Sequence, residues 1–205
     1  MANMTPASKH APAGGGYRLT MKTGALTGLS ATNPIFSLQW THLTTKMVIQ
    51  SVEVQVGVTT AYGTAQNQAF SLFFARSFTA ADTGGTAITK TQTNDQALDT
   101  QFGQSLLFAG NGDCRISSTG TLTAGTRTLD DQPLAGWIFG ATALALAPAP
   151  SGPARKEFGI LDATNPITLR QNEGIVIVND VAMGATGVVL VYVTIEWMEV
   201  PGNVR

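Results

Sequence analysis

The chain has 205 residues, a net charge of −1 and a charged fraction of 12%, which is about half the usual share. This length fits one domain that buries enough surface to fold without disulfide or metal staples. The near-neutral charge provides no field that would attract nucleic acid or an anionic membrane, so we expect neither partner.

The first 16 residues are predicted to form a flexible extended N-terminal arm, and residues 17–205 a single domain. The arm contains Pro6, Pro12 and three consecutive glycines, and it has no hydrophobic periodicity. Residues 1–52 carry four basic side chains and no carboxylate, namely Lys9, Arg18, Lys22 and Lys46. This asymmetry is either chance in a charge-poor sequence or a basic arm that lies against an acidic neighbour.

The first half of the domain contains four predicted strands, at 17–23, 35–41, 47–58 and 70–78. In 47–58 four valines alternate with polar residues, which predicts one face in the core and one in solvent. In 70–78 we place Phe70, Leu72, Phe74 and Phe78 on one face and Phe73 on the other. Aromatic residues on both faces predict a strand covered on both sides, by another sheet or by a neighbouring subunit.

Residues 79–113 are weakly patterned and rich in turn motifs, with one short predicted strand at 86–90. Long loops of this kind are usually functional or make contacts. The segment 132–154 is uncharged, but its prolines and small residues argue against a lipid-facing helix. Further strands are predicted at 114–118, 121–123, 137–146, 156–161, 167–170 and 174–179. Only 101–107 has the character of a helical turn.

The last strand, at 187–200, is apolar on both faces. Val189, Val191, Val193, Ile195 and Trp197 share one face, and Val188, Leu190, Tyr192 and Met198 share the other. We therefore predict a central strand whose second face is covered by a second layer or a sister subunit. Together the segments predict an all-β fold, an antiparallel β-sandwich of about eight to ten strands.

Few titratable groups are available for a catalytic site. His10 lies in the arm and His42 beside an early strand. Cys114 is the single cysteine, so no disulfide forms within the chain and a reducing cytosol is expected. Arg115 next to it would lower a thiol pKa, but only His42 is available as a base, so we expect Cys114 to be a core residue. No nucleophile elbow or zinc spacing is present, and we predict no catalysis, no metal and no cofactor.

The carboxylates also give no clear indication of a catalytic or metal site. Four aspartates fall in predicted loops and are read as solvated turn residues or, less favoured, as calcium ligands: Asp82, Asp95, Asp99 and Asp113. Glu196 and Glu199 are three positions apart in a strand, which places them on opposite faces and separates them as an acid–base pair. Residues 110–115 begin like a phosphate-binding loop, but no helix follows.

Four segments carry a family resemblance. They are GGTAIT at 84–89, RISSTGTLTAGTRTLD at 115–130, PITLRQNEGIVI at 166–177 and TIEWMEV at 194–200. In this order they resemble small virion structural proteins of tailed bacteriophages, over roughly residues 70–200. The motifs are turn and strand patterns without chemistry, so they indicate a family and leave the role in the particle open. The arm has no such likeness.

The resemblance implies a jelly-roll-like β-sandwich that acts as a capsid decoration, or cement, protein. Such a protein binds and stabilises the capsid shell, is made in the host cytoplasm and resides on the virion surface. The implied partners are the major capsid protein and further copies of the chain, a homotrimer by analogy. The candidate subunit contacts are Lys9, Arg18, Lys22, Phe73, Trp137, Phe139, Leu190 and Tyr192.

Two alternatives remain at this point. One is another virion role, as a head fibre, a tail adaptor or another tail component. The other is a carbohydrate-binding host-attachment module, in which Trp40, Trp137 or Tyr62 would stack on a sugar ring.

Overall fold

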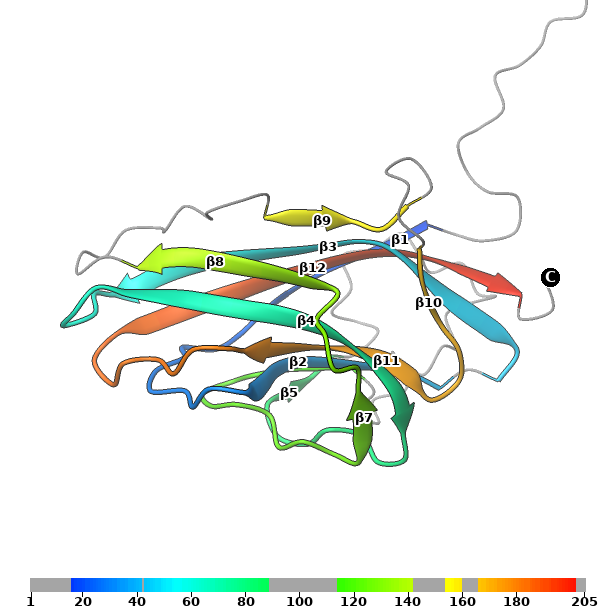
Figure 1. The fold of residues 1–205 in the computed structure, drawn as a ribbon, viewed down its shortest axis with the longest axis horizontal. Helices are drawn as coiled ribbons and strands as arrows, with labels where there is room; N and C mark the ends of the chain where they lie inside the picture. Colours follow the sequence, from blue (N-terminus) through cyan, green and yellow to red (C-terminus); the bar gives the residue numbers. More distant parts are fainter. Residues whose placement is uncertain (1–15, 42, 89–113, 142–153, 160–165, 202–205) are drawn as a thin grey trace, which may run out of the picture.

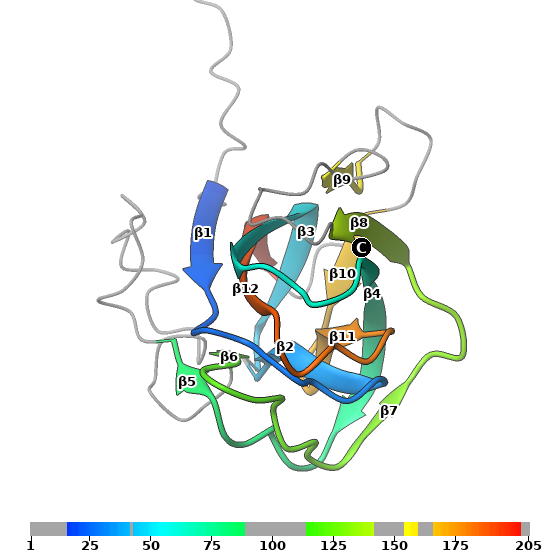
Figure 2. The ribbon, with the colours of Figure 1, turned by 90° about the vertical axis from the view of Figure 1, so that its left-hand side faces the viewer.

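The structure, a computed structural model, describes residues 16–41, 43–88, 114–141, 154–159 and 166–201. Within these ranges the chain forms twelve strands and no helix, which confirms the all-β prediction. The strands make two antiparallel sheets that face each other across a common core, as in a β-sandwich (Figures 1 and 2). Residues 1–15 of the predicted arm and the segments 101–107 and 110–113 lie outside the described residues.

Sheet A has the order β1–β12–β3–β10, and β9 also pairs with β3. Sheet B has the order β5–β6–β2–β11–β4–β7, and β8 also pairs with β4. In sheet A the strands are β1 (Gly16–Lys22), β3 (Thr45–Thr60), β9 (Arg155–Glu157), β10 (Ile167–Leu169) and β12 (Val188–Pro201). In sheet B they are β2 (Asn33–Trp40), β4 (Gln66–Phe78), β5 (Thr86–Ala87), β6 (Cys114–Ile116), β7 (Arg127–Leu129), β8 (Ala135–Ala141) and β11 (Glu173–Asn179).

Most strands fall where the sequence places them, with three differences. Strand β7 was not predicted, because its three residues carry no alternation of polar and apolar side chains. The segment 121–123, predicted as a strand, contributes only an isolated bridge between Thr83 and Thr123. Gly16, assigned to the arm, is already the first residue of β1.

Strand β12 is central in sheet A, as predicted, because it pairs with β1 on one side and β3 on the other. Its inward side chains Val189, Val191, Val193, Ile195 and Trp197 are at most 1% exposed. On its second face Tyr192 is 36% exposed. In the described part of the chain, the second layer expected over that face does not bury this tyrosine.

A β-bulge in β3 explains why its apolar pattern changes parity. Val52 and Val54 point into the core, and so do Met47 and Ile49, which a strict alternation would place outside. The register with β12 shifts between Glu196 and Trp197, so that β3 carries one extra residue at this point. A bulge of this kind moves the next side chains to the other face.

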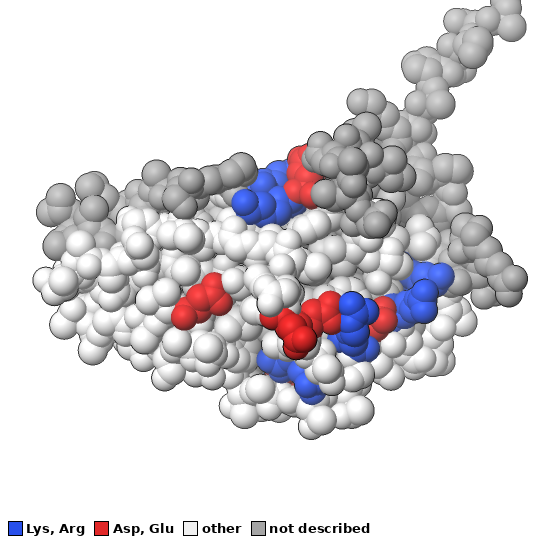
Figure 3. Space-filling view, in the orientation of Figure 1, with Lys and Arg blue, Asp and Glu red and all other residues white. Residues whose placement is uncertain are grey.

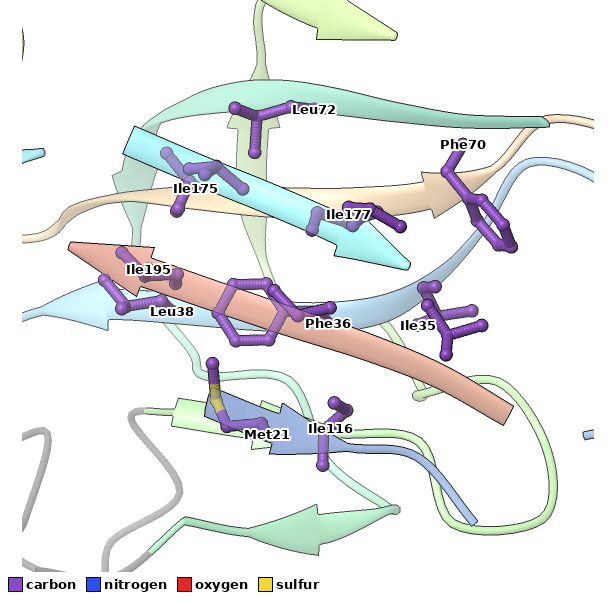
Figure 4. Packing of buried hydrophobic residues seen from close by; sticks show 14 of the residues in the cluster. Met21, Ile35, Phe36, Leu38, Phe70, Leu72, Ile116, Ile175, Ile177 and Ile195 are labelled. Carbon is purple, nitrogen blue, oxygen red and sulfur yellow. The ribbon is translucent and has the colours of Figure 1, made fainter. Parts of the chain in front are cut away.

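The core lies between the two sheets. Figure 4 shows Phe36, Leu72 and Ile177 of sheet B pointing toward Met21 and Ile195 of sheet A. Each of these five side chains is at most 4% exposed. Burying a side chain of this size contributes roughly 1.5–3 kcal/mol, so the core supplies most of the stabilisation of the fold.

Strand β4 is covered on both sides, as predicted, but its faces differ from the prediction. Phe70 and Leu72 belong to the main core, and Phe74 packs against it. Phe78 belongs instead to a second cluster with Ala75, Val176 and Val178, against which Phe73 packs. The prediction that Phe78 shares a face with Phe70 was therefore wrong, because the register with β7 shifts between Ala75 and Ser77.

Candidate functional site

The outer face of sheet A is the best candidate for a functional surface. We use this name for the side chains of β1, β12 and β3 that point away from the core. The strand register aligns them in rows: Arg18 beside Glu196, Thr20 beside Thr194 and Lys22 beside Tyr192. The rows continue into β3, with Gln55 beside Tyr192 and Gly57 beside Leu190. Residues far apart in sequence thus form one continuous surface.

One half of this face is held by an ion-pair network centred on Glu196. Arg155 of β9 donates from Nη2 to Glu196 Oε2 at 2.6 Å and from Nη1 to Oε1 at 3.3 Å, and its Nε lies 3.1 Å from Glu157 Oε1. The Ser51 hydroxyl donates to Glu196 Oε2 at 3.1 Å. Arg18 Nε lies 3.7 Å from Glu196 Oε1.

The network links the four strands β1, β12, β3 and β9 across the sheet. Arg155 is 43% exposed in its side chain, so each pair contributes at most about 1 kcal/mol. The main effect of the network is to fix the positions of charged groups along one border of the face.

The other half is apolar and open. Tyr192 is 36% exposed, and Val188 and Leu190 beside it along β12 are half-buried. Gly57, opposite Leu190, has no atom within 4 Å of the position where a Cβ would stand. The exposed Lys22 flanks Tyr192. An exposed aromatic ring with aliphatic side chains beside it is typical of protein–protein contact surfaces, and Lys22 lies at the edge of this group.

Four of the candidate contacts therefore come together on this face: Arg18, Lys22, Leu190 and Tyr192. Phe73 lies elsewhere, on the outer side of sheet B, where it packs against the second cluster. Lys9 lies outside the described residues. Trp137 and Phe139 are 3% and 1% exposed and belong to the core of the chain. The prediction of Trp137 and Phe139 as subunit contacts is thus corrected, because in 137–139 only Ile138 points outward, at 51% exposure.

The aromatic residues proposed for sugar stacking are also buried. Trp40, Tyr62 and Trp137 are 0%, 2% and 3% exposed. Both indoles donate to backbone carbonyls, Trp40 Nε1 to Thr45 at 2.8 Å and Trp137 Nε1 to Ala154 at 2.6 Å. None of the three rings is available to a sugar in this structure.

Cys114 is a core residue, as predicted: it is 1% exposed and its Sγ lies 3.7 Å from Met21 Sδ. The neighbouring Arg115 donates from Nη1 to the Gly84 carbonyl at 2.7 Å. The two histidines and three of the loop aspartates lie outside the described residues: His10, His42, Asp95, Asp99 and Asp113. Among the residues that are described, no group of three or more His, Cys, Asp or Glu is placed to hold a metal ion.

The prediction that Asp82 is a solvated turn residue is wrong. It is 2% exposed and forms an ion pair with Arg127. The first reading was wrong because turn composition does not reveal that a second segment of chain packs over the turn.

Glu196 and Glu199 lie on opposite faces of β12, as predicted. Glu199 is 1% exposed and accepts a hydrogen bond from Trp197 Nε1 at 3.2 Å. Burial raises the pKa of Glu199 to about 8, and the Trp197 hydrogen bond opposes that rise. The carboxyl group is therefore mostly protonated at neutral pH, which the local sequence gave no means to detect.

The comparisons with known proteins identify no relative. No protein-family model matches the sequence, and no curated protein matches it with significance.

In the described part of the chain no helix has the length and hydropathy needed to cross a membrane. Figure 3 shows that charged side chains occupy only a small part of the face seen in Figure 1 and gather in groups, one of them over β9.

Proposed function

We propose that this chain is a non-catalytic structural protein of a tailed-phage virion, and that it binds and stabilises the capsid shell as a decoration protein. The sequence resemblance supports the class of protein. The single observation that carries the binding role is the open apolar row of Tyr192, Leu190 and Val188 on the outer face of sheet A. Tyr192 in this row pairs with Lys22 of β1, the strand that follows directly on the predicted arm.

The chemistry of this face suits a protein partner. Tyrosine and arginine are enriched at the centres of protein interfaces, and tyrosine buries a large area there at low entropic cost. The ion-pair network on Glu196 gives the same face a border of fixed charge that would orient a partner. The proposed partners are the major capsid protein and sister copies in a homotrimer, with residues 17–205 acting as one domain.

The jelly-roll description is part of the same proposal. Several strands that follow each other in sequence lie in opposite sheets, such as β1 and β2, β3 and β4, and β11 and β12. Connections that cross between two sheets are a feature of Greek-key and jelly-roll sandwiches, which supports this finer assignment.

The test is binding of the purified protein to capsids that lack it. Tyr192→Asp places a charge in the apolar row and should weaken cosedimentation with capsids by at least about tenfold, the equivalent of roughly 1.4 kcal/mol. Ile138→Asp is the matched control, because Ile138 is 51% exposed on β8 of the other sheet and should bind normally.

A second readout separates the head from the tail. Immunogold labelling of complete particles should mark the head, and particles without the protein should lose resistance to heat. Labelling confined to the tail, or equal binding of both variants and wild type, would contradict the proposal.

A further inference from the structure

Polar side chains are enclosed at one end of the sandwich, where the connection from β3 to β4 meets the segment between β11 and β12. Gln68 and Asn179 are both 0% exposed, and Tyr62 is 2% exposed. We call Tyr62, Gln66, Gln68 and Asn179 the polar end cluster. All four side chains are neutral, so the cluster provides hydrogen-bond donors and acceptors and no charge.

The strand pattern sends these side chains inward. Gln66 and Gln68 continue the inward face of β4 that carries Phe70 and Leu72, and Gln68 is the register partner of the buried Phe139. Asn179 is the register partner of Phe70 and continues the inward face of β11 from Ile175 and Ile177. Gln68 and Asn179 are therefore diagonal neighbours across two adjacent strands, at roughly 7–8 Å, a distance that long side chains reach.

Two side chains of the polar end cluster make hydrogen bonds to the backbone. Gln66 Oε1 accepts from the Gly184 amide at 3.1 Å, and Asn179 Nδ2 donates to the Ser30 carbonyl at 3.1 Å. Five buried atoms of the cluster remain. Within the residues that the structure describes, no hydrogen-bond partner is found for Tyr62 Oη, Gln66 Nε2, Gln68 Nε2, Gln68 Oε1 and Asn179 Oδ1. Buried amide atoms of native proteins are almost always paired, with protein groups or with ordered water.

The surroundings limit what can pair with them. A Cβ at Gly187 would stand 2.1 Å from Tyr62 Cδ1, and one at Gly184 would stand 3.0 Å from Gln66 Oε1. The segment between β11 and β12 is therefore packed directly onto Tyr62 and Gln66 at these two glycines. A buried water typically makes about three hydrogen bonds, and the three unpaired atoms of Gln68 and Asn179, one donor and two acceptors, match the need of one such water.

We propose that the polar end cluster binds one or two internal water molecules between Gln68 and Asn179. Gln68 Nε2 donates to water oxygen, and water hydrogens are donated to Gln68 Oε1 and Asn179 Oδ1. The bound water then joins the inward faces of β4 and β11, so that this end of the sandwich is held by a hydrated polar network in place of apolar packing. This site is independent of the proposed virion role.

Gln68→Met tests the proposal against Leu72→Met. Both positions are on the inward face of β4 and 0% exposed, and both become methionine. If water is bound, Gln68→Met removes the hydrogen bonds between the Gln68 amide and that water. The Tm of this variant should then be lower than that of Leu72→Met by roughly 3 °C or more. If the buried Gln68 amide has no hydrogen-bond partner, replacing it with an apolar side chain removes its desolvation penalty. The Tm of Gln68→Met should then equal or exceed that of Leu72→Met.

A crystal structure of the wild-type protein gives a second test that does not depend on a variant folding. Water density within hydrogen-bonding distance of both Gln68 and Asn179 supports the proposal. Empty density at the Gln68 amide, or density for a larger molecule there, overturns it, and so does a Tm for Gln68→Met at or above the control.

Discussion

The carboxylate of Asp82 and the guanidinium of Arg127 form an ion pair whose side chains are 0% and 5% exposed. The Gly125 amide donates to Asp82 Oδ1 at 2.8 Å, and the Arg127 guanidinium carbon lies 5.7 Å from the centre of the Phe78 ring. The pair thus joins the segment after β4 to the segment that enters β7. It closes the second cluster on the outer side of sheet B, where Leu129 also packs.

Removing one partner of this pair should strongly destabilise the fold. Asp82→Asn leaves the buried Arg127 charge uncompensated, and the free energy of unfolding should fall by about 3–5 kcal/mol in urea denaturation. Burial lowers the pKa of the Arg127 guanidinium, because desolvation disfavours its charged form. Arg76→Ala is the control, since Arg76 pairs with Asp130 but is 65% exposed and should cost about 1 kcal/mol or less. Equal losses in the two variants would disprove the structural role of the buried pair.

Glu199 should make stability fall as pH rises. Its pKa is raised from 4.5 to about 8 in the folded protein, so the folded chain holds a proton that the unfolded chain releases. The stabilisation is fully present below pH 4.5 and is lost progressively up to about pH 8, at up to about 1.4 kcal/mol per pH unit. The measurement is the urea midpoint between pH 5 and pH 8.

Glu199→Gln removes the titrating group and keeps an acceptor for Trp197 Nε1, so the fall with pH should flatten. Glu157→Gln, at 57% side-chain exposure, should leave the wild-type slope. A slope that persists in Glu199→Gln would show that another group is responsible.

Gly187, just before β12, and Gly57, within β3, should respond in opposite ways to substitution by alanine. At Gly187 a Cβ would stand 2.1 Å from the Tyr62 ring, which is 2% exposed and has little room to move, so Gly187→Ala should cost about 1–3 kcal/mol. At Gly57 no atom lies within 4 Å, and Gly57→Ala in mid-strand should stabilise by about 0.5–1 kcal/mol. Thermal unfolding of the pair gives the comparison, and a neutral Gly187→Ala would refute the packing at this end.

Adjacent residues of β12 should differ sharply when each becomes aspartate. Val193 is 0% exposed between the sheets, and a carboxylate there should abolish folding. Tyr192, the next residue, is 36% exposed on the outer face, and Tyr192→Asp should fold normally. Soluble yield and far-UV circular dichroism distinguish the two. A soluble, folded Val193→Asp protein would mean that the orientation of β12 is wrong.

The sequence predicts those features that depend on local periodicity. The alternation of Val189 to Trp197 is a period-two pattern, and it placed β12 in the core without knowledge of its neighbours. What it could not reveal depends on residues brought together by the fold. Arg155 and Glu196 are 41 positions apart, and only the pairing of β9 with β3 aligns them. Phe78 was assigned to the wrong face because a register shift in β4 has no signature in composition.

The position of β12 has a consequence for how the protein is made. β1 and β3 leave the ribosome early, yet they do not pair with each other, because β12 lies between them. Sheet A therefore cannot close until residue 201 has been synthesised, and its inward valines stay without their partners until then. Such long-range pairing slows folding and exposes strand edges to aggregation. Folding yield should thus depend on chaperones that protect the nascent chain.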